Sequence, residues 1–415
     1  MFIARAGLDP IIDAAYLLPA TQLAQRGRAV RFVVPSAIGE FVRPQLRRRW
    51  IERRRTITEH LPRGLTRLVS PPSRFAGFWD DSVSAAQWLK WKYGRAPRVI
   101  LHCHGVDSAR IALGVRRRLP GVKVVLYSLG PYSQETVYGL LGEIPPQLSP
   151  DVQTIANRCD ERERFVFQNA DAVVCLSQKM IQYGAERYGL EPARTAFIPF
   201  FLDIQPFLQA GERRPLMRDR LDLGSDATIV YCGSLHRWQR PAEIVRVFRL
   251  IATVRPKVRF LTLTTNPDKM RELARSAGIV DAARHLKVPY QKVPDYLAAA
   301  DLGIIGRGLF EQPMLINGIS SPIKFGEYLA AGCPVILAEG IGDFSEMAET
   351  FQLGTTIPCD AGDEAIADLI GHALDSYAAN CEDVRRRCRD FAQERFCLDK
   401  AIDTLMSLYQ RLDAV

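Results

Sequence analysis

The side chains best suited to chemistry gather in one segment of the second half of the chain, Ser320–Ile336. Ser320-Ser321-Pro322 predicts a polar turn that opens a helix. The first backbone N–H groups of that helix and the ammonium group of Lys324 would suit a phosphate. Glu327 could accept hydrogen bonds from two adjacent hydroxyl groups, such as those of a ribose. The same residues also fit a plain N-cap and an ordinary i,i+3 surface pair, so the segment alone leaves both interpretations open.

A second candidate cluster is the sequence His102-Cys103-His104-Gly105 at the end of a predicted strand. Alternation along a strand places His102 and His104 on one face of the sheet. A metal site would need a third ligand, and no carboxylate or cysteine stands at a suggestive spacing, so no metal is expected. His104 then either touches a substrate or is a hydrogen-bonded structural histidine.

Strand–helix alternation in both halves of the chain predicts the elements that position these residues. Such alternation builds parallel sheets covered by helices on both faces, and there are enough strands for two sheets. The polar, proline-containing stretch Pro199–Gly224 is the expected boundary between them. The predicted strands are Ala29–Val34, Val99–Cys103, Val122–Tyr127, Ala172–Leu176, Thr195–Ile198, Thr228–Tyr231, Arg259–Leu263, His285–Val288, Leu302–Ile305 and Pro334–Leu337.

Length and composition agree with two ordinary globular domains. The chain has 415 residues, of which 47% are hydrophobic and 24% charged. Its nine cysteines include no CxxC pair, which argues against a disulfide framework or a zinc site and for a reducing compartment. No apolar run reaches the roughly 18–20 residues of a membrane span, and the first residues do not read as a signal peptide. We therefore expect a cytoplasmic protein.

The basic charge lies in the first half of the chain. Residues 1–200 carry 29 Lys and Arg against 17 Asp and Glu, whereas the remainder carries 26 against 29. Ten arginines stand within residues 43–74, with Trp50 and several aliphatic residues between them, and Lys90-Trp91-Lys92-Tyr93 adds to this surface. The pattern suits an anionic membrane surface, nucleic acid or a solvated basic face, and by itself leaves all three open.

Five motifs carry a resemblance to a known family, in its order and spacing, over roughly residues 95–350. They are the strand Asp171–Ser177, Ile198-Pro199 followed by Asp203 and Phe207, the strand and loop Tyr231–Leu235, the run Val293–Asp301, and the helix end Glu327–Val335. Together they resemble the retaining glycosyltransferases of the GT-B fold, the "glycosyl transferases group 1" family. This resemblance implies an α/β protein of two doubly wound, Rossmann-like domains that face a cleft.

The resemblance also implies a division of labour between the domains. Residues 1–205 would form the acceptor-side domain and residues 206–385 the donor domain, with a C-terminal helix, 386–415, packing back on the first domain. The reaction would move a hexose from a nucleoside-diphosphate sugar to a glycan or lipid-linked acceptor with retention, in cell-envelope or exported polysaccharide synthesis. Such an enzyme would be cytoplasmic, with peripheral attachment to the cytoplasmic face of the membrane as an option. Because many enzymes of the resembled family act on lipid-linked acceptors, the resemblance ranks an anionic membrane surface first as the partner of the basic segment 43–74, a solvated basic face second and nucleic acid third.

Individual site residues follow from the same resemblance. Glu327 would hold the ribose, and Gly233, Ser234, Ser320 and Ser321 would lie against the diphosphate. The positive charge would come from Arg237, Arg240 and Lys324, and Lys324, Arg237 and His104 are the expected catalytic residues. The sequence has no Asp-x-Asp metal-bridging pair, so we expect neither a metal nor another cofactor.

Three departures from the family pattern keep a non-catalytic alternative open. Ile319 stands where the family often has a first glutamate, Ser234 and Gln239 stand where it has Arg and Lys, and Leu129 lies where a catalytic histidine or aspartate is common. A catalytically impaired GT-B protein, acting as a scaffold or partner subunit in polysaccharide synthesis, is the alternative. A GT-B epimerase is less favoured because its histidine and carboxylate set is missing.

Overall fold

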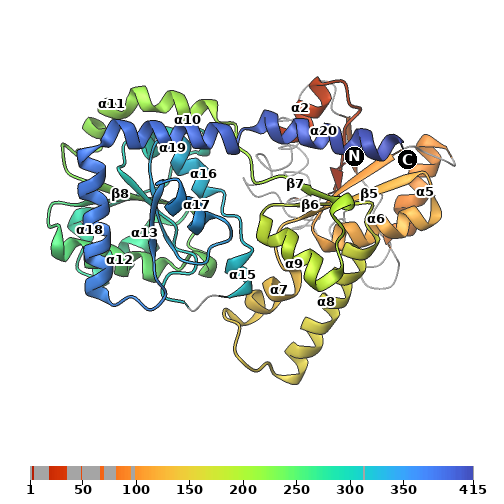
Figure 1. Ribbon diagram of the computed structural model, residues 1–415, viewed down its shortest axis with the longest axis horizontal. Coiled ribbons are helices and arrows are strands. Elements are labelled where there is room, and N and C mark those ends of the chain that lie inside the picture. Colours follow the sequence, from red (N-terminus) through yellow and green to blue (C-terminus); the bar gives the residue numbers. More distant parts are fainter. Residues whose placement is uncertain are drawn as a thin grey trace. The chain divides into compact units, whose positions relative to one another are not determined.

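The chain forms two compact units, each built on a parallel sheet. The computed structural model describes residues 2–3, 18–34, 48, 66–69, 81–94, 99–311 and 314–414. The first unit contains Met1–Ile198 together with Asp399–Val415, and the second contains Pro199–Leu398 (Figure 1). The predicted α/β class with two parallel sheets is confirmed. The chain leaves the first unit after residue 198 and returns to it after residue 398, whereas residues 205 and 385 were expected. Residues 199–205 and 386–398 belong to the second unit.

The first unit has a seven-stranded sheet in the order β3-β2-β1-β4-β5-β6-β7. Every adjacent pair is parallel. Chain order reverses between β1 and β4, and in such sheets ligands collect beyond the carboxyl ends of the strands near this point. The strands are β1 (Phe2–Ile3), β2 (Arg31–Val34), β3 (Thr66–Val69), β4 (Val99–His104), β5 (Val122–Ser128), β6 (Ala172–Cys175) and β7 (Thr195–Phe197).

Helices cover both faces of this sheet. Strands β5 and β6 and the second half of β4 are almost entirely buried, as strands of a doubly covered sheet must be, and Leu101, Val124 and Val173 have no exposed surface. The side chain of Ser177 caps a helix by accepting a hydrogen bond from the N–H of Met180 at 3.0 Å. The helices are α2 (Leu18–Gln25), α5 (Asp81–Tyr93), α6 (Val106–Arg118), α7 (Tyr132–Leu141), α8 (Pro150–Asn169) and α9 (Gln178–Tyr188).

The second unit has a six-stranded parallel sheet in the order β10-β9-β8-β11-β12-β13. Its last strand, β13, was not among the predicted strands, because its sequence, Gly-Thr-Thr-Ile, is short and only its last residue is buried. The strands are β8 (Thr228–Cys232), β9 (Arg259–Leu263), β10 (Ala283–Leu286), β11 (Leu302–Ile304), β12 (Val335–Ala338) and β13 (Gly354–Ile357).

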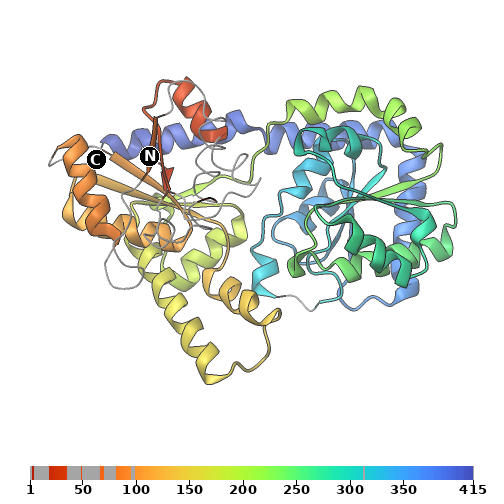
Figure 2. The same cartoon turned by 180° about the vertical axis from the view of Figure 1, so that it is seen from behind.

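The helices of the second unit lie on both sides of its strands, as the view from behind also shows (Figure 2). Helix α12 packs against α18, and α16 packs against α19. The helices are α10 (Gln205–Ala210), α11 (Arg214–Arg220), α12 (Pro241–Val254), α13 (Pro267–Ser276), α14 (Val293–Ala298), α15 (Leu315–Gly318), α16 (Lys324–Ala330), α17 (Phe344–Thr350), α18 (Asp363–Ala379) and α19 (Cys381–Arg395).

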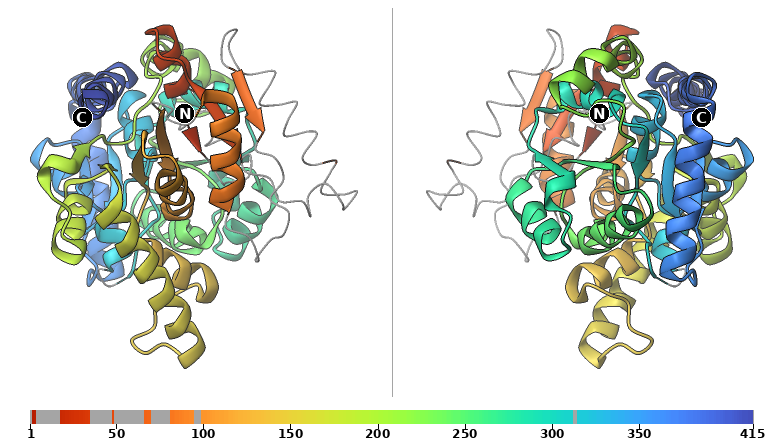
Figure 3. Two further views of the ribbon diagram at one scale, coloured as in Figure 1. Left: turned by 90° about the vertical axis from the view of Figure 1, so that its right-hand side faces the viewer. Right: turned by 90° about the vertical axis from the view of Figure 1, so that its left-hand side faces the viewer.

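The expected single C-terminal helix is two helices that belong to different units. Helix α19 ends at Arg395, and α20 (Leu398–Ala414) begins after a break where Cys397 pairs with Leu202 of the second unit. Most of α20 packs on the first unit, where the Tyr409 hydroxyl lies 2.6 Å from Nδ1 of His102. In Figures 1 and 3, α20 and the α7–α8 pair lie on opposite sides of that unit. Among the described helices, none combines the length and apolar composition that crossing a bilayer requires.

Candidate functional site

Helix α16 locks together the two strand ends from which the predicted donor loops leave the second sheet. The Tyr328 hydroxyl accepts a hydrogen bond from the N–H of Cys232 at 2.8 Å and donates one to the carbonyl of Ile304 at 3.2 Å. It therefore ties the end of β8 to the end of β11, which are neighbours in the sheet. Glycine at 303 makes this packing possible, because a Cβ there would lie 2.5 Å from the Tyr328 ring.

The start of α16 differs from the expected serine cap. The helix begins at Lys324, its N-cap is Ile323, and no side chain caps it. Ser320 is buried and its N–H already donates to the carbonyl of Asn317 at 3.1 Å, while Ser321 is half-buried. Ile319, at the position of the family's first glutamate, is buried as well. The expected serine cap is therefore absent, and the N–H of Ser320 is already engaged within the protein.

Lys324 lies directly over Gly233, the residue that follows β8. A Cβ built on Gly233 would meet Cε of Lys324 at 2.3 Å and Nζ at 3.0 Å, so a side chain here would displace the end of the lysine from its present position. The loop is held in place by the Tyr231 hydroxyl, which donates to the carbonyl of Ser234 at 2.6 Å, and by the N–H of Gly233, which donates to the carbonyl of Leu263 at 2.8 Å. The structure thus brings Lys324 next to the loop that contains Gly233 and Ser234.

Glu327 shares this site with Lys324 and with a tyrosine that the sequence did not indicate. Its side chain is buried, and the Tyr290 hydroxyl donates to Glu327 Oε1 at 3.0 Å. Burial raises the pKa of Glu327, and the ammonium group of Lys324 opposes that shift. Burial likewise lowers the pKa of Lys324, and the Glu327 carboxylate opposes it. The two groups stabilise each other's charge in a place where water does not.

The two predicted arginines are not part of this cluster. Arg240 donates to Glu311 at 2.7 Å and to Glu243 at 3.5 Å, so carboxylates balance its charge. Its backbone has a φ of 51° at the end of a short 3-10 helix, a conformation that the following helix α12 holds in place. Arg237 lies in that 3-10 helix with its side chain exposed.

Another cation, Arg307, lies near Lys324 and was not identified from the sequence. It stands three residues after β11 and donates a hydrogen bond to the Ser320 hydroxyl. Its guanidinium carbon lies 5.5 Å from the ring centroid of Trp238, and its charge contributes to lowering the pKa of Lys324. The available signal was position: residues that follow parallel strands collect at the ligand-binding edge of the sheet. Tyr290, which follows β10, carries the same signal.

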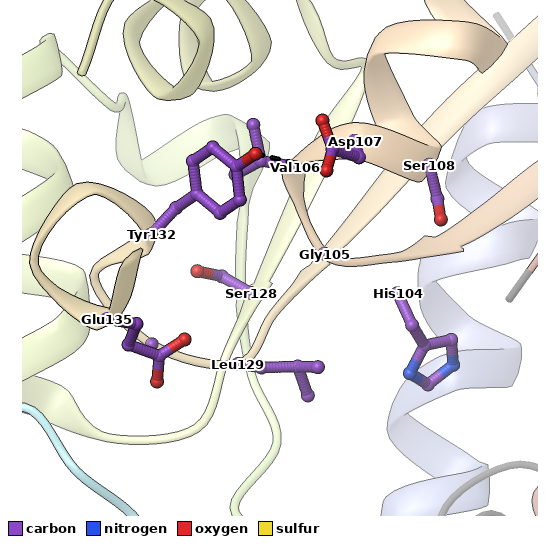
Figure 4. Close-up of a pocket in the computed structure, with 10 residues that line it drawn as sticks. His104, Gly105, Val106, Asp107, Ser108, Ser128, Leu129, Tyr132 and Glu135 are labelled. Carbon is purple, nitrogen blue, oxygen red and sulfur yellow. Dashed lines mark hydrogen bonds between the residues drawn. The ribbon is translucent and has the colours of Figure 1, made fainter. Parts of the chain in front are cut away.

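The first unit has a pocket of about 460 Å³ at the carboxyl ends of β4 and β5 (Figure 4). The Tyr132 hydroxyl donates to Asp107 at 3.0 Å, and Ser128, Leu129 and Glu135 also line the pocket. The polar lining groups are hydroxyls, carboxylates and one imidazole. The lining residues are His104, Gly105, Val106, Asp107, Ser108, Ser128, Leu129, Gly130, Tyr132 and Glu135.

His104 lies in this pocket and His102 lies behind it. The His104 ring stacks on Tyr127 with centroids 4.7 Å apart and lies 5.0 Å from the His102 ring. Burial lowers the pKa of His104 well below its ordinary value and that of His102 to about 3, so both are neutral at pH 7. Among the described residues, no group of three His, Cys, Asp or Glu side chains is placed to hold a metal ion.

The basic segment 43–74 lies almost entirely outside the described residues, apart from residue 48 and strand β3. The second basic and aromatic group is described, at the end of α5. There the side chain of Trp91 is 81% exposed beside the exposed Lys90.

Comparison with known proteins agrees with this geometry. Residues 20–205 match the family model "Glycosyltransferase Family 4", and residues 226–376 match "Glycosyl transferases group 1". No curated protein sequence matches significantly. The two parallel-sheet units and the two matching family models define the class: the chain belongs to the glycosyltransferases of the GT-B type.

Solved structures of this class superimpose on nearly the whole chain. HepE from Anabaena, in complex with UDP, is 14% identical with a TM-score of 0.66, and 99% of each chain is covered. Sucrose-phosphate synthase from Thermosynechococcus elongatus is 15% identical with a TM-score of 0.70, covering 100% of this chain and 98% of that one. WaaG, a glycosyltransferase involved in lipopolysaccharide biosynthesis, is 16% identical with a TM-score of 0.66, covering 97% and 98%. At such identities the likeness shows the fold.

Proposed function

We propose that this protein transfers a hexose from a nucleoside-diphosphate sugar to a glycan or lipid-linked acceptor, with retention and without a metal. The observation that carries the proposal is the cluster of Gly233, Lys324, Glu327 and Tyr290 at the carboxyl edge of the second sheet. HepE, whose structure holds UDP, has the same fold over its full length.

Each member of the cluster suits one part of a nucleoside diphosphate. Glu327 is a buried acceptor that already takes a hydroxyl hydrogen bond from Tyr290, as it would take one from a ribose. Gly233 lets a phosphate approach the backbone, with Ser234 beside it, and Lys324 supplies positive charge against that backbone. Cleavage of the sugar–phosphate bond leaves negative charge on the diphosphate, and a cation fixed in a partly dry site stabilises that charge as it develops. Fixed side-chain cations would stabilise the negative charge on the diphosphate, as a bound metal ion does in metal-dependent glycosyltransferases.

The acceptor would bind in the pocket of the first unit. Its lining offers the hydroxyls of Ser128 and Tyr132, the carboxylates of Asp107 and Glu135, and the neutral imidazole of His104. These groups hydrogen-bond to sugar hydroxyls and repel anions, so the pocket suits a neutral hydroxyl-rich group. His104 would contact the acceptor as a hydrogen-bonding group, because its lowered pKa keeps it uncharged at neutral pH.

A titration tests the donor site. One of UDP, GDP or ADP should bind the wild-type protein and raise its melting temperature. Glu327→Gln should weaken that binding by tenfold or more, because a charged acceptor of a hydroxyl hydrogen bond is replaced by a neutral one. Glu382→Gln, an exposed carboxylate on α19, is the matched control and should bind as the wild type does. Binding by Glu327→Gln at wild-type strength would place the ribose elsewhere.

Turnover and stereochemistry need a second measurement. Incubation with the matching nucleotide sugars should release the diphosphate, and the anomeric configuration of the product, read by NMR, should equal that of the donor. Inversion would reject the retaining mechanism, and full activity after exhaustive chelation supports independence from metals.

The scaffold alternative is supported by two positions in the structure. Ile319 is buried and apolar where a sugar-binding carboxylate is common, and Leu129 is 44% exposed in the first unit's pocket where a histidine or aspartate is common. A protein that binds no nucleoside diphosphate and releases none from any nucleotide sugar would be this scaffold.

Attachment of the first half to an anionic membrane is a further part of the proposal. The exposed Trp91 beside Lys90 gives an interfacial aromatic next to positive charge. Co-sedimentation with vesicles containing phosphatidylglycerol should exceed that with pure phosphatidylcholine and should survive in part at 0.5 M salt. Trp91→Ala should remove the salt-resistant part. If 0.5 M salt released the wild-type protein completely from the vesicles, the basic segment would be a solvated face rather than a membrane-binding surface.

A further inference from the structure

We propose that Arg307 is the second phosphate-binding cation of the donor site and that it contacts the phosphate farther from the ribose. This inference rests on the proposed function, because it assigns a further residue to the same nucleoside-diphosphate site. Sequence motifs pointed instead to Arg237 and Arg240 as the partners of Lys324.

Topology puts Arg307 at the same edge of the sheet as the cluster. Strand β11 lies between β8 and β12, and all three are parallel, so their carboxyl ends meet at one edge. Gly233 follows β8 and Arg307 follows β11. Helix α16 leads back to the start of β12, so its first residue, Lys324, also lies toward that edge. The Tyr328 hydroxyl ties the ends of β8 and β11 together beneath them.

Two contacts orient the guanidinium group of Arg307. It donates to the hydroxyl of the buried Ser320, and it lies 5.5 Å from the ring centroid of Trp238. Ser320 belongs to the turn before α16, and Trp238 belongs to the loop after β8. The arginine is therefore held between the two segments that carry the predicted phosphate-binding residues. A planar group fixed in this way loses little freedom when it binds a phosphate through two parallel hydrogen bonds.

The positive charge of Arg307 acts on neighbouring groups of the site, which favours the binding of an anion there. Its positive charge is close enough to Lys324 and His236 to contribute to lowering the pKa of both groups. Two like charges brought together at a partly dry site repel each other, and a bound anion relieves that repulsion.

The order of residues on α16 and its preceding turn assigns the two phosphates. Glu327, at the ribose end, stands one turn into the helix, Lys324 stands at its first position, and Ser320 stands before it. Arg307 donates to Ser320, which of these three residues is the farthest in sequence from Glu327. A nucleoside monophosphate would reach Lys324 and miss Arg307, whereas a diphosphate would reach both.

Binding of nucleoside mono- and diphosphates to Arg307→Gln tests the inference, using calorimetry and the base that wild-type titrations select. Arg307→Gln should weaken binding of the diphosphate by ten- to a hundredfold, as loss of a charged hydrogen-bond donor does, and that of the monophosphate by less than threefold. Arg307→Lys, which keeps the charge but not the fork, should recover part of the loss. Arg249→Gln, an exposed arginine of α12, is the matched control and should leave both affinities unchanged.

Each other outcome overturns the proposal in a distinct way. Equal diphosphate affinity in Arg307→Gln and wild type would remove Arg307 from the site while leaving the proposed function intact. Equal loss of mono- and diphosphate binding would contradict the assignment to the remote phosphate. If no nucleoside diphosphate binds the wild-type protein, the proposed function fails and this inference fails with it. A ligand-free melting temperature of Arg307→Gln within about 2 °C of wild type shows that lost affinity is not lost folding.

Discussion

Glu327 and Tyr290 reach one another from different elements, and their pairing gives a direct prediction about sugar recognition. The wild-type protein should prefer a ribonucleoside diphosphate to its 2′-deoxy analogue by about tenfold, because the carboxylate would lose one charged hydrogen bond. In Glu327→Gln the preference should fall below threefold. Competitive titration of the two nucleotides measures the ratio, and an unchanged ratio would show that the ribose hydroxyls bind elsewhere.

Glu163 is a buried carboxyl group whose protonation is coupled to folding. It accepts hydrogen bonds from the N–H groups of Tyr132 and Ser133, at 3.3 and 3.4 Å, where α7 begins. Burial raises its pKa from 4.5 to about 7. Between these values the unfolded chain has already released the proton that the folded chain keeps. This group therefore stabilises the fold at low pH, and that stability is lost as the pH rises toward 7.

Glu163→Gln should remove this pH dependence. Relative to wild type, the variant should gain stability by about 1.4 kcal/mol for each pH unit between about 4.5 and 7, or about 3 kcal/mol in all. Urea unfolding of both proteins at pH 5 and pH 7.5 measures the difference, in which contributions of the buried histidines cancel. A stability difference that does not change with pH would show that Glu163 is ionised in the folded state.

Helix α16 packs against the core and also carries residues of the proposed donor site. Substitutions at two glycines that contact these parts, Gly326 and Gly233, test the two roles separately. A Cβ on Gly326 would lie 2.4 Å from the ring of Phe200, whereas one on Gly233 would meet the flexible end of Lys324. Gly326→Ala should destabilise the second unit by about 1–3 kcal/mol, the usual cost of overpacking. Gly233→Ala should unfold at nearly the wild-type urea concentration but bind nucleoside diphosphate at least tenfold more weakly. If Gly233→Ala were strongly destabilised but still bound nucleoside diphosphate, Gly233 would have a packing role rather than a binding role.

The regular elements could be predicted from the sequence, but several contacts between them could not. Apolar strands such as Val122–Tyr127 and the glycine loop at 233 have local signatures, and both were found. Strand β13 has almost none, and the break between α19 and α20 is set by pairing of Cys397 with Leu202, almost 200 residues away. Arg307 and Tyr290 were missed because their only signal is that each follows a parallel strand, and no motif marks them. They come near Lys324 and Glu327 only when the parallel strands align.

The two-unit organisation predicts separate responses to shortening the chain. Helix α20 buries Ile402, Leu405, Leu408 and Tyr409 on the first unit and adds ion pairs from Arg26 to Asp399 and Arg28 to Asp413. Each large apolar side chain contributes about 1.5–3 kcal/mol when buried. Deletion of residues 399–415 should therefore lower or abolish the melting transition of the first unit and leave nucleotide-dependent stabilisation of the second. Calorimetry with and without nucleotide separates the two transitions, and equal loss in both would contradict this organisation.

The most direct test of the donor-site assignment is a crystal structure with the nucleoside diphosphate that the titrations select. A ribose hydroxyl oxygen should lie within about 3.2 Å of a Glu327 carboxylate oxygen, and phosphate oxygens should lie within about 3.2 Å of Nζ of Lys324. A nucleotide bound with its phosphates at Glu327, or at a site that touches neither Glu327 nor Lys324, would contradict the account.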